Sequence, residues 1–329
     1  MNVENSKKMK AIVYKERGPP AVFQQIEVEK PTPKDDEVLV KVHAASINSW
    51  DWELLRKKPS MVNLGRRSDS RFKILGADIA GQVEAVGKDI KQLQLSDEVF
   101  GDLCNSGWGG FGEYVCAREN ALLRKPASMT FQQAAAIPQA GLLALQGLRK
   151  GQIQQGQKIL LNGAGGGVGS FALQIAKSLG AEVTGVDSKS KLDMLRSIGA
   201  DEVIDYTKED FTKNGQAYDL ILDVVATRSL SDYKHSLRPD GKCVLIGGSK
   251  FIIFKALCFG SLGNKKVSLL LYKPNKELAF MTELFEAGKV IPVIDRCYPL
   301  SKVAEAFRYF GEGNVKGKIV INVVSNNKT

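Results

Sequence analysis

Residues 158–170, KILLNGAGGGVGS, contain five glycines within seven residues directly after an apolar run. Glycine has no Cβ atom, so its backbone can turn sharply and approach other groups closely, but each glycine loses more conformational entropy on folding than other residues. The run before the cluster has the composition of a buried strand. The segment after it, VGSFALQIAKSLG, places its apolar residues on one helical face. The sequence therefore predicts a strand, a tight turn and a helix.

This turn has the spacing of a dinucleotide-binding loop. Gly163, Gly166 and Gly169 lie three residues apart, and Gly165 and Gly167 add further bare backbone. A pyrophosphate can lie against such a loop at the helix N-terminus, where unpaired N–H groups and the positive end of the helix dipole favour an anion. The alternative is a purely structural turn. The candidate cofactor-binding loop comprises Gly163, Ala164, Gly165, Gly166, Gly167, Val168 and Gly169.

The choice between NAD and NADP depends on the end of the next predicted strand. Asp187 follows Gly169 by 18 residues, and an acidic residue there can accept a hydrogen bond from the ribose 2′-OH of NAD. Lys191 and Tyr206 instead favour the 2′-phosphate of NADP. A solvated loop is the third interpretation. We expect NADP(H), with NAD(H) left open, and add Ser188 and Gly247 to the candidate cofactor-binding residues.

The pattern along the chain predicts two kinds of domain. The sequence predicts short strands at residues 10–14, 37–43, 81–86 and 112–117. It also predicts a helix over residues 131–150 that Pro138 interrupts. Between residues 157 and 247 apolar strand-like runs alternate with helical segments, which predicts a parallel sheet covered on both faces. A helix over 276–290 and a strand over 318–324 are expected to return to the first domain.

The length, cysteine content and net charge of the chain limit the classes of protein to consider. A length of 329 residues suggests two domains, and no apolar run approaches the roughly 18 residues of a transmembrane helix. Five scattered cysteines predict neither a disulfide framework nor a structural zinc site, so we expect a cytoplasmic protein. The net charge of +10 could attract nucleic acid or anionic lipid, but a solubilising surface explains it without a partner. We expect no nucleic-acid partner.

Residues 249–273, SKFIIFKALCFGSLGNKKVSLLLYK, are both apolar and basic. One interpretation is a substrate-cleft and subunit-contact segment, in which KKVSLLLYK is an edge strand that pairs with its copy in a homodimer. A second is association with a membrane surface through apolar residues flanked by lysines. A third is interior packing.

Five segments in order along the chain resemble the medium-chain dehydrogenase/reductase superfamily, in its zinc-independent quinone oxidoreductase branch. These segments are ASINSWD (45–51), ILGADIAGQVEAVG (74–87), AAIPQAGLLALQGL (135–148), LLNGAGGGVGSFALQIAKSLGAEV (160–183) and GKIVI (317–321). The resemblance implies an α/β protein in which a doubly wound parallel Rossmann sheet binds the cofactor. It also implies a β-rich, barrel-like GroES-like catalytic domain. We expect the GroES-like domain over 1–128, completed by 273–329, and the Rossmann domain over 129–272.

Zinc-dependent members of that superfamily carry a Cys ligand where this chain reads SINSWD, and a His-Glu pair where it reads GAD at 76–78. Catalytic zinc needs thiolate, imidazole or carboxylate ligands that converge tetrahedrally, so we predict no metal. The resemblance implies that Asn48 and Asp51 line the cleft near the nicotinamide, that Asp78 supports the domain, and that Lys318 lies near the cofactor. Turn chemistry is the alternative explanation for Asn48 and Asp51, because Asn, Ser and Asp side chains hydrogen-bond their own backbone. Two residues differ from those usual in this branch: Asp187 stands where a small residue is usual, and Leu143 stands where a threonine is expected.

The resemblance also implies the reaction: hydride transfer from NADPH to the activated C=C bond of a quinone, enone or alkenal. Asn48 would hydrogen-bond the carbonyl oxygen as charge develops there, and Asp51 would orient its neighbours. Two alternatives stay open at this point. One is an NAD(P)-dependent alcohol dehydrogenase-like enzyme, and the other is a non-catalytic NADPH-binding protein that contacts RNA.

Overall fold

The computed structural model of the protein describes residues 7–56 and 73–324. Their contacts group them into two compact units. The first unit comprises the described residues up to Gln139, Pro274–Thr282, and those from Ile294 onward. The second comprises Ala140–Lys273 and Glu283–Val293. None of the helices in these described ranges is long and apolar enough to cross a membrane.

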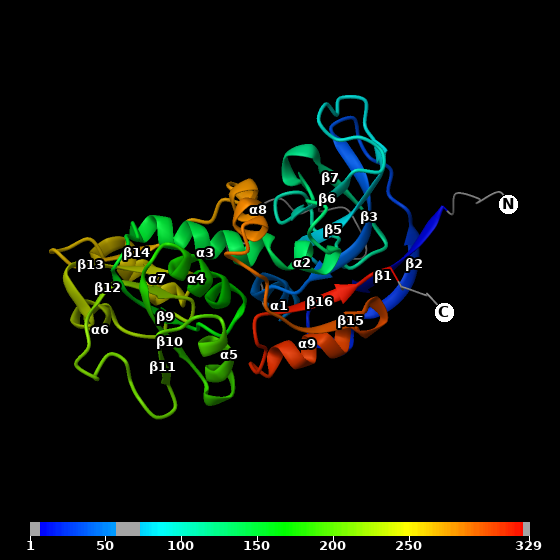
Figure 1. Ribbon diagram of the computed structural model, residues 1–329. Helices are drawn as coiled ribbons and strands as arrows, with labels where there is room; N and C mark the ends of the chain where they lie inside the picture. Colours follow the sequence, from blue (N-terminus) through cyan, green and yellow to red (C-terminus); the bar gives the residue numbers. More distant parts are fainter. Residues whose placement is uncertain (1–6, 57–72, 325–329) are drawn as a thin grey trace. The chain divides into compact units, whose positions relative to one another are not determined.

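A parallel sheet forms the centre of the second unit (Figure 1). Its strands are β9 (Lys158–Asn162), β10 (Glu182–Asp187), β11 (Glu202–Asp205), β12 (Tyr218–Asp223), β13 (Leu237–Leu245) and β14 (Lys266–Leu269). They lie in the order β11-β10-β9-β12-β13-β14, and each neighbouring pair is parallel. The chain builds outward from β9 to one side and then returns to build from β12 on the other. This order is that of a doubly wound sheet, as the sequence predicted.

Helices cover both faces of this sheet, which explains why its strands are almost continuously apolar. They are α3 (Pro138–Gly151), α4 (Gly167–Ser178), α5 (Leu192–Ser197), α6 (Leu230–His235) and α7 (Lys250–Phe259), with a 3-10 turn η3 (Lys189–Lys191) before α5. Leu220 and Leu222 of β12 point toward α3, where a side chain on Gly151 or Gly147 would collide with them. Ile221, between them, joins a buried cluster with Tyr233 of α6. Successive residues of one strand therefore fill two opposite cores.

The predicted helix break at Pro138 is confirmed. α2 (Phe131–Ala136) begins with a capping box in which Thr130 and Gln133 satisfy each other's backbone N–H groups. α3 begins at Pro138, because proline has no N–H to donate to α2 but suits the first turn of a new helix.

The first unit is β-rich. Its strands are β1 (Lys8–Tyr14), β2 (Gln24–Glu29), β3 (Glu37–Ser46), β4 (Lys73–Ile74), β5 (Asp78–Val86), β6 (Glu98–Asp102), β7 (Tyr114–Arg118), β8 (Leu123–Arg124), β15 (Ile294–Pro299) and β16 (Lys318–Asn322). The larger sheet runs β15-β16-β3-β5-β6-β8, with β7 paired to β3, and the smaller runs β2-β1-β4. The predicted strands at 10–14, 37–43, 81–86 and 112–117 correspond to β1, β3, β5 and β7.

The first unit also contains the helices α1 (Ser49–Arg56), α2 and α9 (Val303–Gly311) and the short turns η1 (Pro20–Val22), η2 (Glu119–Ala121) and η4 (Leu300–Lys302). Residues 129–139, which were expected in the Rossmann domain, therefore group with the first unit instead. An aromatic group packs α1 and α9 onto the sheets. In that group the Phe307 ring lies 4.9 Å from Phe23, 5.8 Å from Phe111 and 6.4 Å from Trp52. Segments from both ends of the chain therefore share one core.

The prediction that the C-terminal helix and strand return to the first domain is confirmed for the strand and only in part for the helix. β16 pairs antiparallel with β3, which places it in the first unit as expected. The predicted helix over 276–290 is observed as α8 (Leu278–Glu286), but it does not return wholly to the first unit. Residues Glu283–Val293 group with the second, where Gln174 of α4 exchanges two hydrogen bonds with the backbone of Ile291.

Candidate functional site

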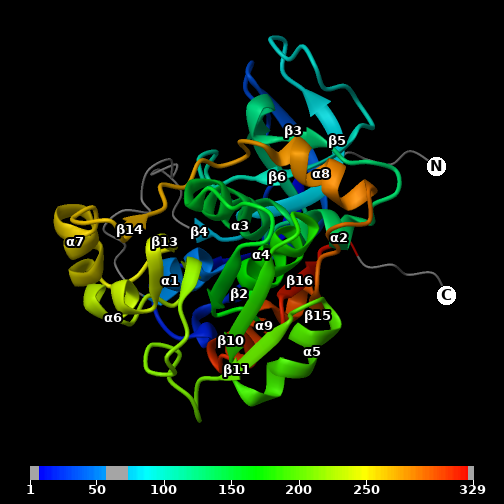
Figure 2. The same ribbon diagram turned by 60° about the vertical axis from the view of Figure 1, so that its left-hand side comes forward.

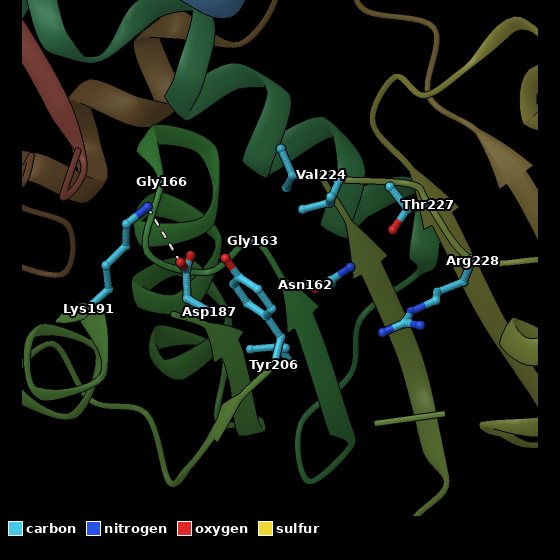
Figure 3. A pocket seen from close by; sticks show the side chains of 11 residues that line it. Asn162, Gly163, Gly166, Asp187, Lys191, Tyr206, Val224, Thr227 and Arg228 are labelled. Atoms are coloured by element: carbon cyan, nitrogen blue, oxygen red, sulfur yellow. Dashed lines mark ion pairs between the residues drawn. The ribbon is translucent and has the colours of Figure 1, made fainter. Parts of the chain in front are cut away.

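A pocket of about 470 Å³ opens at the carboxyl ends of β9, β10 and β12 (Figure 3). β9 and β12 are the neighbours between which the direction of chain winding reverses, and this is where open α/β sheets bind ligands. Figure 3 shows Lys191 and Asp187 on one side of the pocket and Thr227 and Arg228 on the other. The lining residues are Asn162, Gly163, Gly166, Val186, Asp187, Lys191, Tyr206, Val224, Val225, Thr227 and Arg228.

The glycine loop turns tightly between β9 and α4. Gly163 has φ +83°, a conformation that glycine adopts without strain, and its N–H donates to the carbonyl of Val186 at 3.0 Å. The N–H of Ala164 donates to the same carbonyl at 3.1 Å. A Cβ atom on Gly169 would lie 2.3 Å from the Gly163 oxygen, so the helix approaches the strand at a distance that only glycine permits.

Gly166 lines the open pocket, and a Cβ atom there would meet no atom closer than the Gly163 oxygen, at an ordinary contact distance of 3.6 Å, unlike Gly165 and Gly169. It is the N-cap of α4 and has no side chain to satisfy the first N–H groups of that helix. Those groups have no partner within the helix and, with the helix dipole, attract an anion. The bare backbone, the open space and the helix end together fit a phosphate group.

Asp187, at the end of β10, is almost fully occupied by hydrogen bonds within the protein. Its Oδ2 accepts from the Gly165 N–H at 2.8 Å, and its Oδ1 accepts from the Ser188 N–H at 2.8 Å. Lys191 Nζ lies 3.4 Å from Oδ1, and both side chains are buried. Asp187 therefore holds the glycine loop and Lys191 in place, whichever cofactor binds.

Several pocket residues were missed at the sequence level. Arg228 and Thr227 follow β12, in the segment VVATR, and Arg228 also pairs with Asp210 at 3.1 Å. Tyr206, which was predicted, is 56% exposed and lines the pocket after β11. The available signal for Arg228 was its position just past a parallel strand next to β9, but that adjacency is visible only once the strand order is known.

The structure brings together only some of the predicted cofactor residues. Gly163, Gly166, Asp187, Lys191 and Tyr206 line the pocket. Most of the other predicted residues surround the pocket. Ala164 and Gly165 belong to the glycine loop, Gly167, Val168 and Gly169 form the start of α4, and Ser188 follows β10. Gly247 lies past the end of β13 with φ +86° and does not line the pocket.

Asn48, Asp51 and Lys318 lie in the first unit, in a buried polar network around Asp78. Asn48 Nδ2 donates to Asp78 Oδ2 at 2.9 Å, and Lys318 Nζ donates to Asn48 Oδ1 and lies 3.6 Å from Asp78. The backbone N–H of Gln139 also donates to Asp78 at 3.1 Å. Burial raises the pKa of Asp78 and lowers that of Lys318, and each charge partly offsets the effect on the other.

Asp51 is fully buried at the first turn of α1. Its Oδ2 accepts from the Asn48 N–H and its Oδ1 from the Gly76 N–H, both at 2.9 Å. Burial raises its pKa to about 7, although the two hydrogen bonds oppose the shift. These contacts position Asn48 and the turn at Gly76.

The donor set here does not fit catalytic zinc. In the described ranges no three His, Cys, Asp or Glu side chains lie close enough to hold a metal ion. Asn48 stands among the expected ligand positions. The Asp78 carboxylate already accepts hydrogen bonds from Asn48, Ser46 and the Gln139 backbone, and it forms an ion pair with Lys318. We therefore derive no chemical step through zinc.

Comparison with known proteins agrees with this architecture. The profile of the alcohol dehydrogenase GroES-like domain matches residues 34–127, and that of the zinc-binding dehydrogenases matches 198–321. A chloroplast envelope quinone oxidoreductase homolog of Arabidopsis thaliana is 33% identical over 96% of this chain and 98% of its own length. An NADPH-dependent alkenal/one oxidoreductase of the same plant is 31% identical over 96% of this chain and 80% of its own. The quinone oxidoreductase structure from Coxiella burnetii is 30% identical, with a TM-score of 0.88, over 97% of this chain and 100% of its own.

A GroES-like unit built from both chain ends and a doubly wound sheet with a glycine loop define the medium-chain dehydrogenases/reductases. The chain belongs to this superfamily of oxidoreductases. Within it, the chain belongs to the quinone oxidoreductase-like branch, as the order of its sequence segments indicated.

Proposed function

We propose that the protein is an NADPH-dependent reductase that acts on the activated C=C bonds of quinones, enones and alkenals. The observation that carries this proposal is the pocket at the glycine loop, where bare backbone, a helix N-terminus and the side chains of Lys191 and Arg228 converge. The names of the relatives assign quinone and alkenal/one substrates to those proteins, and the similarity over 96% of the chain supports the same substrate classes here.

In this proposal a bound reduced nicotinamide dinucleotide supplies the hydride that the electron-poor carbon of the substrate accepts. The backbone from Gly163 to Gly169 binds the pyrophosphate, because no Cβ atom at Gly166 obstructs it. Lys191 and Tyr206 hold the 2′-phosphate, and Arg228 lies on the opposite side of the same pocket as a third group of suitable chemistry. Asp187, whose negative charge lies beside Lys191, reduces the preference for NADPH over NADH.

Asn48 is the residue we propose to contact the substrate. One N–H of its amide donates to Asp78 and its oxygen accepts from Lys318, so the amide plane is fixed and its second N–H remains to polarise a carbonyl oxygen. Asp51 is a positioning residue, because it is fully buried and holds the Asn48 backbone. Lys318 likewise acts through Asn48.

The test is to mix the protein with NADPH or NADH and to follow the loss of reduced-nicotinamide absorbance with quinones, alkenals and simple alcohols. Oxidation of NADPH by quinones or alkenals, unchanged by a metal chelator, is the expected result. A rate seen only with alcohols, or abolished by chelator and restored by zinc, would instead support the alcohol dehydrogenase alternative. No turnover together with salt-sensitive RNA binding would support the non-catalytic alternative.

Three further expectations stay predictions. If the protein forms a homodimer, the edge strand β14 is the place where two sheets would pair. We expect no nucleic-acid partner. We expect a cytoplasmic location, although the names of several relatives place those proteins in chloroplasts or mitochondria.

A further inference from the structure

The outer face of α7 carries large apolar side chains that nothing in the described chain covers. Phe251, Phe254 and Leu257 are 65%, 61% and 67% exposed, and Phe259 and Leu262 after them are more than half exposed. We call these five residues the α7 patch. In Figures 1 and 2 the helix lies beside α6 and β14, at the end of the sheet that β14 forms.

The helix is anchored by its inner face. Ile252 and Ala256 are buried in the core cluster of the second unit, together with Val267 of β14. Phe251, Phe254 and Leu257 follow one another at intervals of three, so they share the opposite side of the helix. The helix is therefore held in place while its apolar outer face meets solvent, an arrangement typical of a binding surface.

The segment that carries the patch has only positive charges. Residues 249–273 contain five lysines and no Asp or Glu. Lys255 Nζ lies 4.1 Å from the centre of the Phe251 ring. Lys234 of α6 donates to the carbonyl of Leu262 at 2.8 Å, which places another ammonium group at the edge of the patch. An occupant of this face must be both apolar and anionic.

We propose that α7 is an interfacial helix that binds the surface of a bilayer containing anionic lipid. Phosphate headgroups would pair with the lysines, while Phe251, Phe254 and Leu257 enter the acyl boundary. Ten residues are too few to span a bilayer, so the helix lies in the plane of the interface. A second copy fits less well, because two such faces would oppose their lysines. RNA also fits less well, because the five side chains of the patch are all apolar and none can hydrogen-bond a base edge.

The test is flotation of the full-length protein with vesicles of phosphatidylcholine alone or mixed with phosphatidylglycerol. Binding is expected only with the anionic vesicles, and added salt should weaken it. The double variant Lys250→Gln/Lys266→Gln should lower the partition coefficient about fivefold per lysine. The double variant Phe251→Ser/Phe254→Ser should lower it more than about tenfold, because two apolar side chains no longer enter the lipid.

Matched controls separate this effect from general changes in charge and surface polarity. Lys91→Gln/Lys150→Gln removes the same charge from exposed positions outside the patch, and Leu95→Ser removes a leucine that is 59% exposed elsewhere. Both should bind vesicles as the wild type does. Thermal unfolding of each variant shows whether it is folded, so loss of binding is not confused with loss of structure.

Three results would overturn the proposal. The first is no vesicle binding by the wild type. The second is binding that the control variants weaken as much as the patch variants do. The third is a dimer, seen by analytical ultracentrifugation, that the Phe251→Ser/Phe254→Ser variant dissociates while vesicles have no effect; this would assign the patch to a second copy. NADPH binding is measured separately, so the outcome does not depend on the proposed enzymatic function.

Discussion

Gly166 and Gly169 provide a direct test of how the glycine loop works, because an added methyl group would meet different surroundings at each. At Gly169 the new Cβ atom would lie 2.3 Å from the Gly163 oxygen and 2.5 Å from the Ala164 Cα atom. At Gly166 the nearest atom is 3.6 Å away, and the glycine has φ −84° and ψ −178°, which alanine adopts without strain. We therefore expect Gly169→Ala to damage the fold and Gly166→Ala to damage ligand binding.

The contact distances give the magnitudes. Ordinary Cβ contacts begin at 3.4 Å, so Gly169→Ala must move backbone by about 1 Å, and overpacking of this kind costs about 1–3 kcal/mol. Gly166→Ala changes only an N-cap, where the loss is about 1 kcal/mol or less. Its methyl group, however, enters the space where we expect a phosphate. A tenfold loss of affinity corresponds to about 1.4 kcal/mol, and we expect at least that loss.

Two measurements separate these effects. Chemical denaturation without ligand should show a clear loss of stability for Gly169→Ala and a small one for Gly166→Ala. Titration with NADPH, followed by calorimetry, should show weaker binding for Gly166→Ala although its fold is intact. The reasoning is refuted if Gly166→Ala binds NADPH with unchanged affinity, or if Gly169→Ala is as stable as the wild type.

The other predictions concern three charged residues. Because burial raises the pKa of Asp51 to about 7, the native state holds this proton more tightly than the unfolded chain, and its contribution to stability falls as the pH rises from about 4 to 7. Asp51 alone should lower the free energy of unfolding by about 2.5 kcal/mol between about pH 5 and about pH 8. Asp51→Asn should remove this share of the pH dependence in denaturation series, and an unchanged pH dependence would contradict the assignment. Lys191→Ala should weaken NADPH binding more than about tenfold with little effect on NADH, since only NADPH carries the 2′-phosphate; equal losses in titrations would remove its assigned role. Asp187→Asn should raise the ratio of NADPH to NADH affinity, because it removes a negative charge 3.4 Å from Lys191 Nζ, and an unchanged ratio would argue against this effect.

The glycine loop could be predicted because its requirements are local. Strand, turn and helix follow one another within 21 residues, from Lys158 to Ser178, and each depends on backbone conformation and apolar period. The break at Pro138 was predictable for the same reason, since proline acts on its own helix. The roles of Asp187 and Arg228 were not, because both depend on which strands lie beside β9.

Taken by itself, the sequence determined the alternation of strands and helices, the place of the glycine loop and the absence of the usual zinc ligands in segments 46–51 and 76–78. These features depend on neighbouring residues or on residue type alone. Only the tertiary structure decided that Lys318, 270 residues after Asn48, donates to it, that Glu283–Val293 group with the sheet unit, and that Phe251 and Phe254 face outward while Ile252 is buried. Such features depend on contacts between segments far apart in the chain, and local preferences carry no information about them.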